Sequence, residues 1–176
     1  MHMNLALDDL MDYTDWERQK WHDWFRKHGD EVLKTSVGPN GDGRFTTVGD
    51  LVRHMFSAEK RYIDRLSERA LTETGAIPND NVETLFQFGQ QSRNDLREFV
   101  DTFPAQQLDI PQDHKLGNHV LTATPRKILV HILLHEIRHW AQIGTLLRLN
   151  GLKGEFHDFL FSPVMSGESR REQISS

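Results

Sequence analysis

The chain has 176 residues and a net charge of −5 with histidine counted as neutral. This length suits one domain, which we expect over residues 1–176 with a polar tail from about residue 167. The acidic balance argues against nucleic-acid and anionic-membrane partners, and the absence of cysteine excludes disulfides, thiolate metal ligands and a cysteine nucleophile. No apolar run reaches membrane-spanning length and residues 1–4 do not resemble a signal peptide, so we expect a cytoplasmic protein without membrane contacts.

The first predicted helix covers residues 5–34, where apolar and aromatic side chains recur at helical spacing. It holds three of the four tryptophans, which are Trp16, Trp21 and Trp24. Aromatic side chains at this spacing usually bury apolar area, so core packing is the preferred interpretation. The alternative is that one of the three forms the wall of a pocket.

A second helix is predicted after the turn-rich loop from Ser36 to Arg44. Its start at Thr47-Val-Gly-Asp50 resembles a capping box in which Asp replaces Glu. The helix carries an apolar arc that ends near Leu66, with His54 at the edge of the arc and Glu59 near its centre. An edge position suits a side chain that lines a cleft.

The third predicted helix runs from about Asn81 to Phe103 and is ended by Pro104. Residues 104–123 read as irregular, and the extended pieces at 108–110 and 119–121 could form a β-ribbon. Four predicted helices, long connections and few strand signals together predict an all-α four-helix bundle.

The fourth predicted helix is the most apolar. Thr124 suits the N-cap, Pro125 suits the first helical position, and Asn150-Gly151 suits a left-handed C-cap. We expect the tail that follows to pack on the bundle through its large apolar residues, which are Phe156, Phe159, Leu160 and Phe161.

This fourth helix contains the motif H-E-x-x-H as His135, Glu136 and His139. The two histidines are four residues apart and therefore lie on one face, one turn apart. Neutral imidazole nitrogen is a ligand for zinc, nickel and similar ions. The alternative is a pair of hydrogen-bonded core histidines, because short motifs also match by chance.

His54, on another helix, is the candidate third ligand. Three ligands from two helices leave positions open for water or substrate, which is the usual layout of a catalytic site. His131 is the rival, but it lies two turns from His139, about 11 Å along the axis, so one ion cannot easily reach both. We therefore expect His131 to be exposed or to support a ligand.

A zinc protease also uses H-E-x-x-H. Its extended form is absent, because Gln142 stands at the glycine position and Thr145 at the last histidine position. The downstream carboxylate would have to be Glu155, which has no predicted helix around it. The protease is therefore the less favoured interpretation.

Three segments resemble motifs of the DinB/YfiT-like superfamily. Residues 45–62 resemble its second-helix motif, residues 125–142 its metal-helix motif, and residues 13–16 its opening helix. The resemblance implies a four-helix bundle in up-down-down-up order with a long irregular crossover. It also implies a divalent metal ion, zinc or nickel, on His54, His135 and His139.

Some members of this family transfer low-molecular-weight thiols to electrophiles, and one hydrolyses or isomerises thiol adducts. The resemblance therefore implies a metal-dependent enzyme that acts on a small molecule, such as a thiol S-transferase or a hydrolase. Trp140 stands where histidine is common and Ala141 where glycine is common, which leaves the metal ligands intact and the substrate open.

Further residues have candidate supporting roles. Glu136 could act as a general base or accept a hydrogen bond near a ligand, with a solvent-facing ion-paired charge as the alternative. Gln142 and Glu59 could each orient a ligand imidazole, or simply satisfy core hydrogen bonds. The function from a different class is a non-catalytic metal-binding or small-ligand-binding bundle. The surplus of aromatic residues predicts a homodimer.

Overall fold

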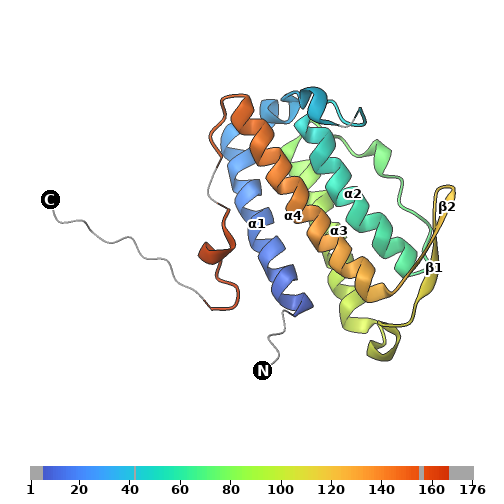
Figure 1. Ribbon diagram of the computed structural model, residues 1–176. Helices are drawn as coiled ribbons and strands as arrows, with labels where there is room; N and C mark the ends of the chain where they lie inside the picture. The colour runs from blue at the N-terminus through green and yellow to red at the C-terminus, as the bar shows by residue number, and fades with distance from the viewer. Residues whose placement is uncertain (1–5, 42, 155–156, 167–176) are drawn as a thin grey trace.

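The computed structural model describes residues 6–41, 43–154 and 157–166 (Figure 1). In this part of the chain, four long α-helices form a bundle and two short antiparallel strands form a hairpin beside it. Their bounds are α1 Leu7–His28, α2 Val48–Leu66, α3 Val82–Thr102, β1 Gln112–Leu116, β2 His119–Ala123 and α4 Pro125–Leu149. This confirms the predicted all-α four-helix bundle. No helix in the described residues is both long and apolar enough to cross a membrane.

The helices run in the predicted up-down-down-up order, with α2 and α3 parallel to one another (Figure 1). The connection over residues 67–81 must therefore return along the bundle to the start of α2. Asn79, near the end of this connection, donates from Nδ2 to Oδ1 of Asp50 at 2.7 Å. A Cβ at Gly49 would lie 1.9 Å from the carbonyl oxygen of Asn79, so the close approach requires glycine there.

The predicted helix starts are confirmed in detail. The Thr47 hydroxyl accepts from the Asp50 N–H at 3.2 Å, and the Asp50 carboxylate accepts from the Thr47 N–H at 3.1 Å, which completes the capping box. Thr124 caps α4 by accepting from the Lys127 N–H at 3.1 Å. At the other end, Gly151 adopts the predicted left-handed conformation with φ +78°.

Two boundaries differ from the predictions. The first helix ends at His28 rather than at residue 34, because Gly29 takes a positive φ of +79° and a separate 3-10 turn follows over Asp30–Lys34. The first strand lies at Gln112–Leu116 rather than at residues 108–110. The hairpin turns at Gly117, which has φ +61°, and this turn fixes the register that pairs β1 with β2.

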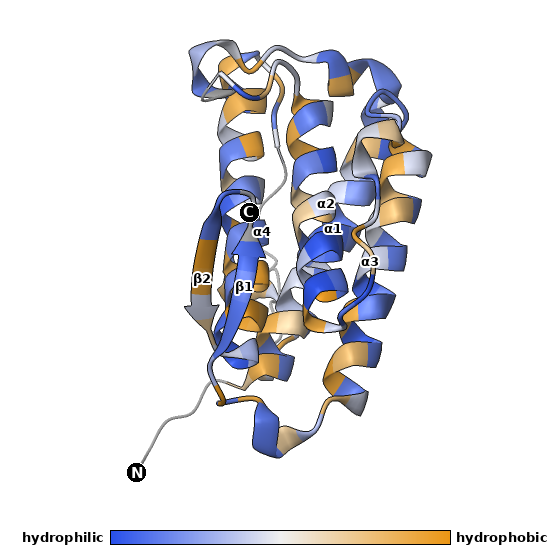
Figure 2. Cartoon of the chain, turned by 90° about the vertical axis from the view of Figure 1, so that its right-hand side faces the viewer, coloured by the Kyte–Doolittle hydropathy of each residue, from blue (hydrophilic) through white to orange (hydrophobic). Residues whose placement is uncertain are grey.

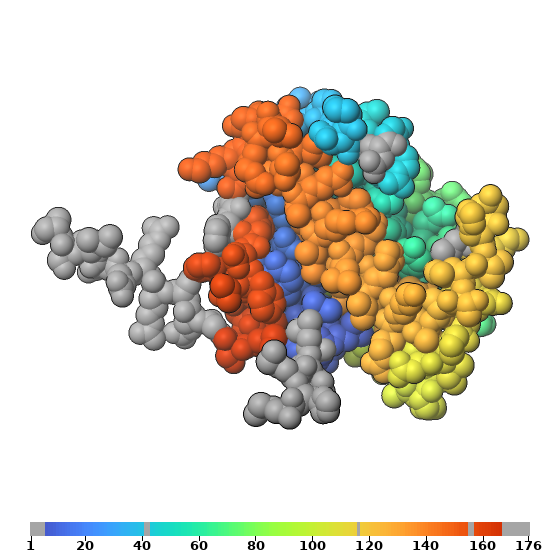
Figure 3. Space-filling view, in the orientation of Figure 1, coloured from blue at the N-terminus to red at the C-terminus, as the bar shows by residue number. Residues whose placement is uncertain are grey.

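The prediction that the tail packs on the bundle through its large apolar residues is confirmed for Phe159 and wrong for Leu160. Leu160 is 81% exposed and Phe161 is 50% exposed, whereas Phe159 makes an edge-to-face contact with Tyr13 at 5.0 Å. The tail forms only a single 3-10 turn over Phe159–Phe161, which cannot direct three successive side chains to one face. This segment runs beside α1 in Figure 3. Phe156 and the polar tail from residue 167 lie outside the described residues.

The interior consists of two apolar clusters, one at each end of the bundle. Each helix carries both hydrophobic and hydrophilic residues along its length (Figure 2), as an amphipathic bundle helix requires. Trp21 and Trp24 are buried in one cluster, which confirms core packing for these two tryptophans. Between the clusters lie four buried charged side chains, one from each helix, which we call the polar layer: Arg18, Glu59, Arg93 and Glu136.

Candidate metal centre

Three histidines from two helices converge on one point. His54 comes from α2, and His135 and His139 come from α4; each offers a ring nitrogen, and these nitrogens lie within 4.8 Å of one another. The Nε2 atoms of His135 and His139 are 3.0 Å apart. The ring of His54 lies 5.2 Å from each of the other two rings, centroid to centroid. The structure thus brings together the three residues that the sequence analysis selected.

The local structure explains this convergence. The spacing of four places His135 and His139 one turn apart on a helix that contains neither proline nor glycine between them. His54 lies at the edge of the apolar face of α2 and is half-buried. It lines two adjacent cavities of about 260 and 250 Å³. The edge position therefore gives a cleft-lining side chain, as the sequence predicts.

Gln142 fixes the hydrogen-bonding state of His139. Its Nε2 donates to the backbone carbonyl of Asn40 at 3.0 Å, and because a carbonyl only accepts, its Oε1 must face His139. His139 Nδ1 lies 2.9 Å from this oxygen and must therefore carry the proton. The lone pair of the neutral ring is then on Nε2, which faces His135. Gln142 thus orients a candidate ligand, as one of its two predicted roles requires.

The electrostatics keep His54 and His135 neutral near pH 7. Burial lowers the pKa of His54 to about 4, and the nearby His139, Arg44 and Arg138 act in the same direction. Burial also lowers the pKa of His135 to about 3, with His139 and His54 contributing. Neutral imidazoles offer the lone pairs that a metal ion needs.

The donor set fits a divalent ion of the zinc or nickel type. Three imidazoles, one with its tautomer fixed by Gln142, are the nitrogen ligands these ions prefer. Among the described residues, no carboxylate joins the group. Three protein ligands would leave coordination positions for water or substrate on the side of the cavities lined by His54.

His131 lies outside the cluster. It is exposed, its ring is 5.6 Å from the ring of His135, and it meets Tyr62 edge-to-face at 5.4 Å. This agrees with the expectation that two helical turns separate it from the far ligand. Glu155, the carboxylate that the protease alternative needs, lies outside the described residues.

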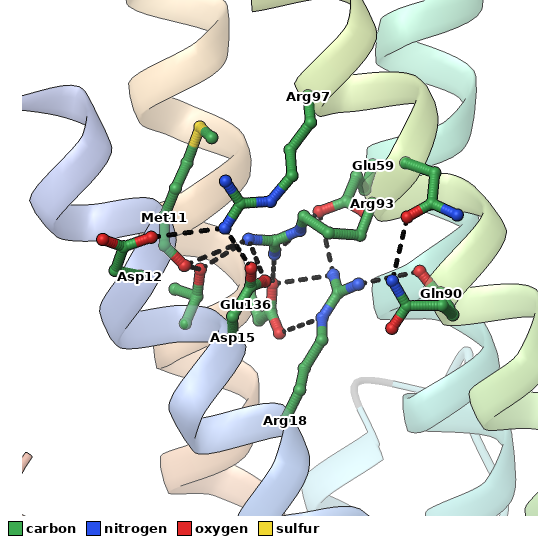
Figure 4. A network of polar contacts seen from close by, with 12 residues as sticks. Met11, Asp12, Asp15, Arg18, Glu59, Gln90, Arg93, Arg97 and Glu136 are labelled. Carbon is green, nitrogen blue, oxygen red and sulfur yellow. Dashed lines mark hydrogen bonds and ion pairs between the residues drawn. The ribbon is translucent and has the colours of Figure 1, made fainter.

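Glu136 is adjacent to His135 in sequence but belongs to the polar layer. Its carboxylate accepts from Arg18 Nε at 2.6 Å and from Arg93 Nη2 at 2.5 Å (Figure 4). It also accepts from the Trp140 indole N–H at 3.1 Å. Burial alone would raise the pKa of Glu136, but the two guanidinium groups lower it. The expectation of a solvent-facing charge is wrong, since Glu136 is 1% exposed.

Glu59 also belongs to the polar layer. Its Oε2 accepts from Arg18 Nη2 at 2.8 Å and lies 3.0 Å from Arg93 Nη2. Its contacts are therefore those of a core carboxylate, one of the two roles expected for it, and no described contact joins it to a histidine.

Sequence reasoning did not select Arg18 and Arg93. Each lies on the apolar face of its helix, between buried residues one turn away on either side: Thr14 and Trp21 flank Arg18, and Gly89 and Leu96 flank Arg93. A charge at such a position predicts a buried partner. The same signal was present at Glu136, which lies between Leu133 and Trp140 on one apolar stripe.

Comparison with known proteins supports the resemblance seen in the motifs. The family model described as the DinB family matches residues 1–172 of the chain. A search of curated proteins finds no match to this chain.

Proposed function

The chain belongs to the DinB family, and from this premise we propose that it is a divalent-metal-dependent enzyme that acts on a small molecule. The observation that carries the proposal is the convergence of His54, His135 and His139, from two helices, beside cavities open to solvent. Such a set suits a catalytic site better than a structural one, because a structural site uses its full shell on protein ligands.

When bound, a divalent ion lowers the pKa of a coordinated water or thiol and so supplies a nucleophile near neutral pH. The residues of this chain provide the lone pairs, the orientation and the rigid frame. Gln142 holds the ring of His139 in one tautomer from behind. The polar layer ties α4 to the other three helices through Glu136 and thereby fixes the backbone that carries two of the histidines.

We propose zinc or nickel as the ion and thiol transfer or hydrolysis as the reaction. Imidazole donors support the choice of metal. The resemblance to family members that use low-molecular-weight thiols supports the choice of reaction. The general-base role of Glu136 stays a prediction, since its described contacts are those of a carboxylate that neutralises two buried arginines.

The homodimer and the cytoplasmic location also stay predictions. Trp21 and Trp24 are buried within the bundle and cannot contribute to an interface, so the described apolar surface available for a dimer includes Leu134, Leu149 and Leu160 instead. Sedimentation at high micromolar concentration should give the mass of a dimer. A clean monomer would contradict the prediction.

Metal analysis of the purified protein tests the site. We expect one divalent ion per chain, lost when His135→Ala or His139→Ala removes a ligand. His131→Ala is the matched control, because it removes a neighbouring imidazole from the same helix and should leave the ion in place. Loss of metal in His131→Ala, together with retention of metal in His135→Ala and His139→Ala, would contradict the assignment of the ligands.

Turnover tests the chemistry. The metal-loaded protein should consume a low-molecular-weight thiol with a model electrophile, and the rate should disappear on chelation and return with added metal. Stoichiometric metal with no turnover across a panel of thiols and of hydrolysable thiol adducts would instead support the non-catalytic metal-binding bundle.

A further inference from the structure

Beside the histidine cluster runs a groove that contains two arginines, Arg61 and Arg65, to which no described carboxylate is ion-paired. Across the rest of the described chain, arginine side chains are mostly ion-paired, as in the pairs Arg26–Glu83, Arg97–Asp15 and Arg126–Asp109. By contrast, no described carboxylate lies within ion-pairing distance of Arg61 or Arg65. In a protein of net charge −5, two such cations in one groove are unexpected.

Two of these arginines continue the face of α2 that carries His54. His54, Ala58, Arg61 and Arg65 recur at intervals of three and four residues, so they form one stripe along the helix. Arg61 lines the 260 and 250 Å³ cavities that also contain His54, and it lines the neighbouring cavity of about 580 Å³ as well. The cavities are therefore successive parts of one groove, with Arg61 in each.

The hairpin forms the opposite wall. Gly117, at its turn, lines the same cavities as Arg65, so the groove passes between α2 and the β1–β2 hairpin (Figure 1). Both ends of the groove also contain carboxylates. Glu68 and Asp113 line the 580 Å³ cavity, and Asp50, paired with Arg53, lines the 250 Å³ cavity, so only the 260 Å³ cavity between them has no acidic lining residue. The cationic stretch is thus limited to Arg61 and Arg65.

The position of the Arg65 guanidinium is electrostatically unfavourable in the free protein. Burial and the nearby Arg61 lower the pKa of Arg65, and these effects outweigh that of Asp64, which raises it. The guanidinium donates to the backbone carbonyl of Arg61 at 3.1 Å and lies over the ring of Tyr62, so it is held in place without a direct ion pair to a described carboxylate. Preorganised guanidinium groups of this kind bind carboxylates and phosphates in bidentate geometry.

We propose that the substrate of the histidine site carries an acidic group, carboxylate or phosphate, which binds Arg61 and Arg65 while its reacting atom lies at the histidine cluster. This inference rests on the proposed function and adds the substrate class. Seven residues separate His54 from Arg61, so the acidic group lies on the order of 10 Å from the reacting atom along α2.

Two linear probes test the proposal by calorimetry on the zinc-loaded protein. Suberate has a carboxylate at each end and approaches the required length, whereas octanoate has the same chain with one carboxylate. Both can place a carboxylate at the ion, so their difference reports the distal anion alone. We expect suberate to bind about tenfold tighter, the size expected for a charge-assisted hydrogen-bonded contact. Replacing the distal carboxylate by a phosphonate shows which of the two acids the groove prefers.

The double variant Arg61→Gln/Arg65→Gln should remove the advantage of suberate and keep the zinc. The control Arg26→Gln/Arg126→Gln removes the same charge from exposed, ion-paired arginines and should keep the advantage. Equal affinity of both probes for the wild-type protein, or an advantage that survives in the Arg61/Arg65 variant, would overturn the inference.

The same titration on chelated protein separates this inference from the proposed function. A preference for suberate that persists without metal and is lost in the Arg61/Arg65 variant supports the anion groove, even if zinc binding itself fails. No preference in either form, with zinc bound, rejects the groove and leaves the metal site standing.

Discussion

The two faces of α4 carry two polar clusters with opposite properties. On one face, Glu136 enters the polar layer, where every charge is matched by an opposite charge and exposure is close to zero. On the other, His135 and His139 join His54 in a group of converging imidazoles, in which burial lowers the pKa of His54 and of His135. Neighbouring residues, His135 and Glu136, therefore serve different clusters.

The difference separates a stabilising network from a binding site. In the polar layer, guanidinium hydrogen bonds to carboxylate and backbone oxygens use most of the bonding capacity, so little remains for a ligand. In the histidine cluster, His139 directs the lone pair of Nε2 at Nε2 of His135, 3.0 Å away. This lone pair is satisfied by an N–H of His135 or by a cation. A metal ion would serve the second purpose for all three rings at once.

The largest effect is expected from breaking the polar layer. Glu136→Ala leaves Arg18 and Arg93 buried without this carboxylate, and removing one partner of a buried ion pair costs about 3–5 kcal/mol of unfolding free energy. Urea unfolding of the metal-free wild-type and variant proteins measures this loss of unfolding free energy. Should the variant fail to fold, Glu136→Gln keeps the shape and should still be clearly destabilised.

The matched control for that experiment is Glu83→Ala on the surface. Glu83 pairs with Arg26 in similar bidentate geometry but is well exposed, so its loss should cost about 0–1 kcal/mol. Equal losses for the two variants would show that the polar layer is not a stabilising network.

In the Glu136→Gln variant, unchanged metal affinity together with abolished turnover would support the predicted general-base role.

Local signals in the sequence were enough to predict the helices and the convergence of the histidines. The capping box at Thr47–Asp50 and the N-cap at Thr124 depend on neighbours three residues away, and His135 and His139 share a face by helical spacing alone. The first strand of the hairpin was predicted several residues too early, because its register depends on the turn at Gly117, which apolar patterning does not locate.

The polar layer could not be predicted in the same way. Arg18 and Glu136 are 118 residues apart, and which arginine meets which carboxylate depends on how the helices rotate against one another. Likewise, Gln142 had two plausible roles until the loop carbonyl of Asn40 decided the orientation of its amide. Contacts across the bundle, rather than periodicity within one helix, determine both outcomes.

A smaller effect is expected when the support behind the histidines is removed. Gln142→Ala frees the ring of His139 to rotate and to change tautomer, and losses of such outer partners typically weaken metal binding about 10–100-fold. Competition against a chelating dye measures the affinity. Gln90→Ala, on an exposed part of α3, is the control and should leave the affinity unchanged.

The smallest effect concerns pH. The pKa values of His54 and His135, about 4 and about 3 in the folded metal-free protein, lie below the ordinary value of 6.5. At a pH below 6.5 and above these lowered pKa values, the unfolded chain therefore binds more protons than the folded protein. The contribution of His54 and His135 to the free energy of unfolding is therefore present above pH 6.5 and is lost as pH falls toward 4.

Unfolding in chelator at pH 7.5 and at pH 5 tests this sign. The wild-type protein should lose more stability between the two values than His54→Ala does, because the variant lacks one of the titrating groups. Glu17 has a pKa raised to about 8 by burial and acts in the opposite direction, but it is present in both proteins and cancels in the comparison. Identical losses in the two proteins would contradict the assignment.

The most direct measurement is the metal content of His54→Ala, compared with the wild-type protein after identical loading. His54 is the ligand on α2, so its loss leaves only the pair on α4, and we expect the ion to be lost. A zinc protease site would use His135, His139 and a downstream carboxylate, and would keep its ion in this variant. Stoichiometric metal in His54→Ala that disappears in Glu155→Ala would contradict the three-histidine site and restore the protease interpretation.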